Sequence, residues 1–138
     1  YKTSKLTEEE ASNYVKTLNE YMAQEKPFLE FELSLEELSN KTGIPQRYLS
    51  QVVNEHYGKN FFDFVNSHRT AEAKRLLAET DLSILEVGLE VGFNSRSTFN
   101  AAFKKHVGSP PSTYRTHIRN APPNDAVKPD KVIVTTSE

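Results

Sequence analysis

An internal repeat constrains the fold of this chain more than any other feature of its sequence. Residues 33–58 and 82–108 share one pattern: a short helix with a serine cap, a glycine turn and a second helix. Matching positions are 49 residues apart before the turn and 50 apart after it, so the second copy has one extra residue. The matched pairs are Leu33 and Leu82, Ser34 and Ser83, Gly43 and Gly92, Ile44 and Phe93, Leu49 and Phe99, Val53 and Phe103, His56 and His106, and Gly58 and Gly108.

Each copy has the pattern of a helix-turn-helix unit. The glycine, Gly43 or Gly92, is expected in the left-handed conformation that residues with side chains resist. The next residue, Ile44 or Phe93, is apolar and is expected to fill the junction between the two helices. The second helix of each copy is apolar only on its inner side, so the polar side chains at its start are free to meet the base edges of DNA.

A helical hairpin with no role in DNA binding is the alternative interpretation, because glycine turns between short helices are common. One copy alone would leave the two interpretations balanced. Two copies with matched polar outer faces favour DNA binding.

The rest of the chain also has the pattern of helices, and no strand alternation of useful length precedes residue 130. Capping boxes of Thr7 with Glu10 and of Ser34 with Glu37 predict where the first two helices begin. Pro45 is expected at the first position of the third helix, where its missing N–H costs nothing. The later helices are expected at about 61–78, from Ser83 to Gly92, from Asn94 or Ser95 to Gly108, and at about 110–118.

The helix expected at 61–78 joins the two copies and sets the distance between them. About 18 residues, at about 1.5 Å each, make a helix of about 27 Å. Neighbouring major-groove faces on one side of B-DNA lie about 34 Å apart. One rigid helix of this length can therefore hold two recognition helices near successive grooves, which repressor dimers achieve by two-fold symmetry.

Charge and composition narrow the function further. The net charge is −2, but residues 1–40 carry four Lys and nine Glu, whereas residues 41–119 carry eleven Lys or Arg against seven acids. A basic middle after an acidic start is compatible with a phosphate-facing surface. The chain has no Cys, no signal peptide and no apolar run of about 18 residues. Its four His lack the spacing of zinc ligands, and we expect neither an enzyme nor a cofactor or metal.

Several motifs resemble the DNA-binding domain of the AraC/XylS family of transcription regulators. The residues that carry the resemblance are Ala73-Lys74-Arg75-Leu76-Leu77, Ile84 to Val91, Gly92-Phe93, Ser97-Thr98-Phe99, Phe103-Lys104-Lys105, Gly108, Pro111 and Tyr114-Arg115. The resemblance covers about residues 33–119. It implies an all-α fold of seven helices, in which a long linking helix joins two helix-turn-helix subdomains. An extra-long acidic first helix precedes them, and we expect a mobile tail over 120–138.

The resemblance also implies that the third and sixth helices bind the major groove. The residues expected to contact bases are Gln46, Arg47, Ser50 and Gln51 in the first unit, and Arg96, Ser97, Asn100 and Ala101 in the second. Arg grips guanine with two hydrogen bonds, and Gln or Asn does so with adenine. Ala101 stands where some relatives have a longer polar side chain, which leaves it a thymine methyl to contact. The residues expected to contact phosphate are Lys59, Arg69, Ser95, Thr98, Lys104 and Lys105, and an internal carboxylate is the alternative partner of Arg69.

The expected organisation is a lead-in helix and connector over 1–32, a DNA-binding domain over 33–119 and a flexible tail over 120–138. Because the chain begins with Tyr1 and has no sensory domain, we expect a sensor domain elsewhere in a longer protein. The expected partner is double-stranded DNA in the cytoplasm, or at a membrane if the sensor domain anchors the protein there. RNA polymerase and a homodimer partner are further candidates. A helical protein-interaction or dimerisation module without base readout is the competing function.

Overall fold

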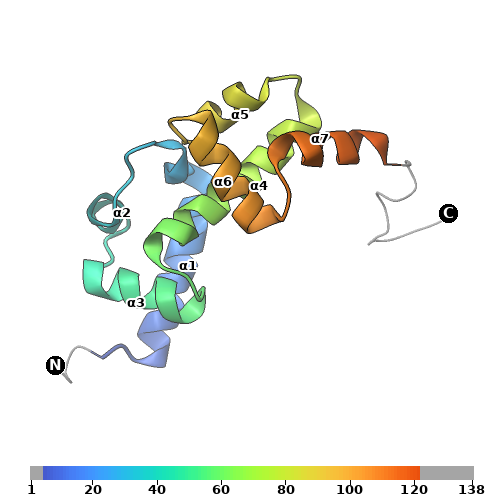
Figure 1. The fold of residues 1–138 in the computed structure, drawn as a ribbon. Helices are drawn as coiled ribbons and strands as arrows, with labels where there is room; N and C mark the ends of the chain where they lie inside the picture. Colours follow the sequence, from blue (N-terminus) through green and yellow to red (C-terminus); the bar gives the residue numbers. More distant parts are fainter. Residues whose placement is uncertain (1–4, 122–138) are drawn as a thin grey trace.

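The computed structural model describes residues 5–121, which form seven α-helices and one short 3-10 helix, with no strand among them. In chain order these are α1 (Glu8–Glu25), η2 (Pro27–Leu29), α2 (Leu35–Thr42), α3 (Gln46–His56), α4 (Phe61–Glu79), α5 (Ile84–Glu90), α6 (Arg96–Val107) and α7 (Pro111–Asn120). The prediction of an all-α, seven-helix fold is confirmed. Figure 1 shows α4 between the first unit, α1–α3, and the second unit, α5–α7. Residues 122–138, most of the predicted tail, lie outside the described residues.

The first helices begin near the residues that the capping patterns predict, and the structure differs from the prediction at Ser34 and at Pro45. The capping box of Thr7 and Glu10 forms, with both hydrogen bonds at 3.0 Å. Within the described chain, the second predicted box is only half formed: Ser34 accepts a hydrogen bond from the Glu37 N–H, and no return bond is made. The exposed Glu37 carboxylate gains little from such a bond over its bonds to water. Pro45 precedes α3 instead of occupying its first position, because its ψ of 142° is extended.

The two turn glycines have the predicted left-handed conformation, with φ of 77° at Gly43 and 109° at Gly92. Gly92 is required for a second reason. A Cβ atom there would lie 2.5 Å from the carbonyl oxygen of Phe28 and 2.7 Å from Nε of Arg69. The backbone of the second turn therefore approaches the connector more closely than any residue with a side chain allows.

Two hydrophobic cores lie on either side of the fold, and α4 contributes to both. Phe64 and Val65 belong to the first core, and Ala73 and Leu77 belong to the second. The first core also buries Leu18, Met22, Phe28, Leu38, Ile44, Leu49, Val52 and Val53, and the second also buries Val87, Val91, Phe93, Phe99, Ala102 and Phe103. Because α4 has 19 residues, the two cores share a rigid helix about 29 Å long.

The lead-in helix α1 is a structural part of the first unit. Leu18 and Met22 are buried in the first core, with 0% and 2% of their surface exposed. The hydroxyl of Tyr57, which follows α3, donates a hydrogen bond to Asn19 Oδ1. The ring of Tyr14 stacks on the ring of Tyr48 in α3, with centroids 6.1 Å apart. Residues 8–25 therefore support the second helix of the first unit.

The last helix, α7, closes the second unit through two arginines. Arg115 donates hydrogen bonds to the carbonyl oxygens of Leu77, Thr80 and Leu82 at 3.1, 3.2 and 2.7 Å. Arg119 donates to the carbonyl oxygens of Leu77 and Thr80 at 3.3 and 2.5 Å. The last carbonyl groups of a helix have no partner within it. These guanidinium groups therefore cap α4 and fasten α7 to its C-terminal end.

Arg69 is buried on α4, with 7% of its surface exposed. Its Nε donates to the carbonyl oxygen of Phe28 at 2.7 Å, and its Nη2 donates to those of Glu30 and Phe31 at 2.8 and 3.3 Å. The prediction that Arg69 contacts phosphate is therefore wrong, and its partners are carbonyl groups instead of an internal carboxylate. The connector crosses α4 with carbonyl groups that lack helical partners, and the fork of a guanidinium satisfies several of them at once.

Burial lowers the pKa of Arg69, but its ordinary value is so high that the group stays charged at neutral pH. The guanidinium carbon also lies 5.5 Å from the ring centroid of Phe93, in the turn of the second unit. Arg69 thus contacts α4, the connector and the second turn.

We expect Arg69→Met to lower the free energy of unfolding by about 3 kcal/mol. It leaves the buried carbonyl oxygen of Phe28 without its donor and removes the hydrogen bonds to the carbonyl oxygens of Glu30 and Phe31. Urea unfolding followed by circular dichroism measures this. Arg75→Met is the matched control, since Arg75 is on the exposed side of the same helix and forms ion pairs with Glu72 and Glu79 of that helix. Equal losses in the two variants would contradict the assigned role of Arg69.

A second prediction concerns His68, whose ring stacks on Phe28 at 5.5 Å and meets Phe64 edge-on at 4.9 Å. Burial lowers the pKa of His68 below its ordinary value of 6.5. As the pH falls below about 6.5, the unfolded chain therefore takes up this proton before the folded one does. The stability that neutral His68 supplies is present above that pH and is lost as the pH falls toward the lower pKa of the folded state.

We expect His68→Phe to keep the aromatic packing and to reduce the loss of unfolding free energy between about pH 7.5 and 5.5. Part of the loss remains, because burial also lowers the pKa of His106. Urea titrations at the two pH values measure the difference, and His117→Phe, at an exposed histidine, is the control. A pH dependence unchanged from the wild type would show that His68 does not contribute.

Candidate nucleic-acid interface

The second helix of the first unit, α3, presents a polar stripe at its N-terminal end. Gln46 and Arg47 are exposed, and Ser50 and Gln51 are partly buried. These positions recur at helical spacing, so their side chains lie on one face. The opposite face carries Leu49, Val52 and Val53, which are buried in the first core. The structure therefore places all four predicted base-contacting residues of this unit together on the outer side of α3.

Contacts that the sequence does not reveal hold part of this stripe in place. Nη2 of Arg47 donates to the Tyr48 hydroxyl at 3.2 Å, and its guanidinium carbon lies 4.8 Å from the centre of that ring. Tyr48 in turn stacks on Tyr14 of α1. Gln51 donates to a carboxylate oxygen of Glu55 at 3.4 Å. The lead-in helix therefore supports the position of Arg47 through one aromatic pair, which no spacing rule could have identified.

The second helix of the second unit, α6, presents the corresponding stripe. Arg96, Ser97 and Ala101 are exposed and Asn100 is partly buried, while Phe99, Ala102 and Phe103 face the second core. Ser95 caps this helix, so Asn94, the alternative start, is excluded. The Ser95 hydroxyl accepts from the Thr98 N–H at 3.1 Å and bonds the Thr98 hydroxyl at 2.9 Å. Both stripes thus begin at the first residue of their helix and use the same four relative positions.

The predicted phosphate contacts are distributed around α6 and the start of α4. Lys104 is exposed in the last turn of α6, and Lys59 is partly buried in the loop before α4. Nζ of Lys105 lies 3.0 and 3.1 Å from the two carboxylate oxygens of Asp63 in α4. Lys105 is therefore partly neutralised by an ion pair, and this pair also joins α6 to α4.

His106 lies beside this ion pair. Its Nε2 is 3.9 Å from an oxygen of Asp63 and is a buried atom with no hydrogen-bond partner among the described residues. Burial lowers the pKa of His106 more than the charge of Asp63 raises it, and Lys105 and Lys59 lower it further. The imidazole is therefore neutral at physiological pH, and it lies in the last turn of α6.

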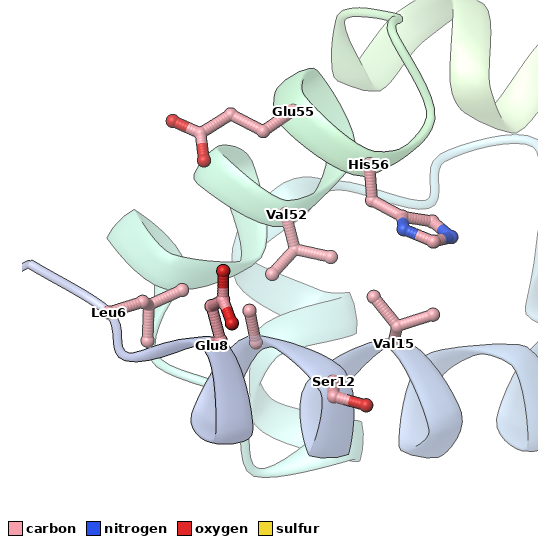
Figure 2. Close-up of a pocket in the computed structure, with 8 residues that line it drawn as sticks. Leu6, Glu8, Ser12, Val15, Val52, Glu55 and His56 are labelled. Atoms are coloured by element: carbon pink, nitrogen blue, oxygen red, sulfur yellow. The ribbon is translucent and has the colours of Figure 1, made fainter.

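A separate hollow of about 280 Å³ lies between α1 and α3. Figure 2 shows Val15 of α1 and Val52 of α3 on its two walls, with the carboxylates of Glu8 and Glu55 nearby. Val52 and Glu55 lie toward the C-terminal end of α3, whereas the polar stripe begins at its first residue. This hollow is therefore distinct from the predicted base-contacting surface.

Two further properties of residues 5–121 bear on the class of protein. None of these helices is both long enough and apolar enough to span a bilayer. No cluster of three or more His, Asp or Glu side chains in this part of the chain is arranged to hold a metal ion. Two glycine-turned helix pairs, each with an exposed polar stripe on its second helix, define a double helix-turn-helix protein.

Comparison with known sequences agrees with this class. The family described as "Helix-turn-helix domain" matches residues 38–117. PqrA, a probable transcription factor of Proteus vulgaris, is 32% identical over 83 residues, which make up 60% of this chain and 68% of PqrA. The chain belongs to the AraC-type helix-turn-helix family of transcription regulators and is not an enzyme. YtdP, an uncharacterized HTH-type transcriptional regulator of Bacillus subtilis, is 32% identical over 66% of this chain, which spans 12% of YtdP.

Solved structures show the same arrangement of helices. The C-terminal domain of the response regulator yesN from Fusobacterium nucleatum matches 75% of this chain and 98% of its own, with a TM-score of 0.64 and 29% identity. The C-terminal domain of AraT from Geobacillus stearothermophilus matches 75% of this chain and 83% of its own, with a TM-score of 0.63 and 27% identity. The DNA-binding domain of AdpA, at 22% identity and a TM-score of 0.65, shares the fold over 86% of this chain.

Proposed function

We propose that this chain binds a specific sequence of double-stranded DNA by placing α3 and α6 in successive major grooves. The observation that supports this most is the matched pair of stripes, which start with exposed residues at the first position of each helix and continue along its outer side. The shared helix α4, about 29 Å long, is comparable with the spacing of about 34 Å between neighbouring major-groove faces. In AdpA, a DNA-binding domain of this fold forms a complex with a target DNA.

The two stripes supply the groups that read bases. Arg47 and Arg96 are exposed at the helix starts and suit guanine, while Gln46, Gln51 and Asn100 suit adenine. Ser50, Ser97 and Ala101 complete the base-facing set. Lys59, Ser95, Thr98, Lys104 and Lys105 contact phosphates, which fix the register of the protein on the duplex.

The unit that binds DNA extends over residues 33–119, and α1 supports it from the side of α3. We infer that a sensor domain in the full-length protein controls this unit, and that RNA polymerase and a second copy of the protein are partners of the bound regulator in the cytoplasm. The small share of YtdP that the chain covers supports a longer protein.

Selection of bound duplexes from a random pool, followed by sequencing, tests the proposed function. We expect two short preferred motifs whose centres are separated by about 10 base pairs, one turn of the duplex. A single motif, or no enrichment, would contradict the use of two successive grooves. A protein-interaction module, the competing function, would enrich no duplex and would bind its partner with little dependence on salt.

We expect Arg96→Ala to weaken binding to the selected site by about 1–3 kcal/mol and to relax the preference at one base pair. The physical reason is the loss of two hydrogen bonds to a guanine edge. Fluorescence anisotropy on the site and its single-base variants measures both effects. Arg75→Ala, at an exposed arginine outside both recognition helices, is the control. Retained affinity and selectivity in Arg96→Ala would show that the base-facing surface is assigned incorrectly.

We expect Lys104→Gln to weaken binding to all DNA sequences equally, because a phosphate contact carries no sequence information. The slope of log affinity against log salt concentration should become shallower by about 1, as one fewer counterion is released. Titrations at several salt concentrations measure the slope. Lys16→Gln, on the exposed side of α1, should leave it unchanged. An unaltered slope in Lys104→Gln would remove this lysine from the phosphate contacts.

A further inference from the structure

A second hollow lies between the start of α4 and the outer side of α6, with a volume of about 360 Å³. It is distinct from the hollow between α1 and α3. The residues that matter for its chemistry are Phe62 and Asp63 of α4, and Ser97, Ala101, Lys105 and His106 of α6. Ser97 and Ala101 also belong to the base-facing stripe of α6, so this hollow opens on the proposed DNA-binding surface.

Phe62 has no role in either core. With 66% of its surface exposed, it is the most exposed large hydrophobic side chain in the described part of the chain. Its neighbours on α4 behave differently: Phe64 is buried in the first core, and Phe61 packs against that core. Phe62 instead lines the hollow between α4 and α6, as Ala101 does. Packing within the fold therefore does not account for an aromatic residue at this position.

The charged groups of this hollow compensate one another. The carboxylate of Asp63 binds Nζ of Lys105 at 3.0 and 3.1 Å. His106 contributes no charge when its imidazole is neutral. The rest of the lining is apolar at Phe62, Ala101 and Ala102 and polar at Asn66, Ser97 and Thr98. The apolar part of this lining matches a neutral, apolar group.

The base edges of the major groove carry one apolar group, the 5-methyl of thymine. We infer that Phe62 and Ala101 together form a seat for a thymine methyl, which makes Phe62 a specificity-determining residue outside both helix-turn-helix units. This inference rests on the proposed function, since it requires α6 to lie in the major groove. Ala101 alone offers one methyl group to such a contact, and Phe62 supplies the larger apolar surface.

Replacement of single thymines by deoxyuridine in the selected DNA site tests this inference, because it removes only the methyl group. We expect one such replacement to lower the affinity of the wild type about fourfold, the effect of one buried methyl group. The same replacement should leave the affinity of Phe62→Ala nearly unchanged. Fluorescence anisotropy with a panel of singly substituted duplexes measures both. Leu85→Ala, at an exposed leucine of α5, is the control and should keep the fourfold effect.

Each other result has a defined meaning. If every deoxyuridine substitution affects the wild type and Phe62→Ala equally, the inference is overturned. If Phe62→Ala weakens binding to all sequences by the same factor, the ring contacts deoxyribose instead, and the inference is again overturned. If the wild type selects no duplex, the proposed function is wrong, and the proposed thymine-methyl contact of Phe62 and Ala101 is wrong as well. Thermal unfolding of Phe62→Ala checks that this exposed substitution leaves the fold intact.

Discussion

The position of one helix-turn-helix unit relative to the other depends on the buried guanidinium of Arg69. Its hydrogen bonds to the carbonyl groups of Phe28 and Glu30 hold the connector against the middle of α4. The guanidinium of Arg69 also contacts the ring of Phe93 in the turn of the second unit. Gly92, in the same turn, lies close to the carbonyl oxygen of Phe28. These two contacts hold the turn against the connector. Burying a charged group costs free energy unless its N–H donors are hydrogen-bonded. The guanidinium of Arg69 therefore has one favourable position, and a small displacement would break its hydrogen bonds. The arginine therefore acts as a fixed point between the two cores.

The shared helix α4 fixes the distance between the two helix-turn-helix units. Its first half belongs to the first core and its second half to the second, so neither unit can rotate without disturbing the packing of the other. The second unit is fastened to α4 at two places: Lys105 of α6 binds Asp63 near its start, and the arginines of α7 cap its end. Dense cores and multiple hydrogen bonds resist small shifts. The distance between α3 and α6 is therefore a property of the whole fold and does not depend on the turns alone.

Features with a local physical cause were predictable from the sequence, and features that depend on distant contacts were not. The turn glycines, the capping box at Thr7 and the two exposed stripes follow from backbone conformation and helical spacing, and the structure contains them. The partner of Arg69 was not predictable, because the donors and acceptors lie about 40 positions apart in the chain and the acceptors are backbone carbonyls without a sequence signature. The same applies to Arg115, whose acceptors are carbonyl groups at the end of α4. Long-range hydrogen bonds from side chain to backbone leave no periodic pattern to detect.

The two helix-turn-helix units have the same backbone arrangement, but the side chains around their polar stripes differ. In the first, Arg47 is held by Tyr48, which stacks on α1, so the orientation of a charged hydrogen-bond donor is set before any partner binds. In the second, the stripe is flanked by a hollow whose charges compensate one another and whose apolar wall includes Phe62. Repressor dimers present two identical surfaces and therefore favour palindromic sites. A single chain that duplicates the unit keeps the spacing and is free of that symmetry. Under the proposed function, the divergence of the two surfaces lets one chain recognise an asymmetric sequence in a defined orientation.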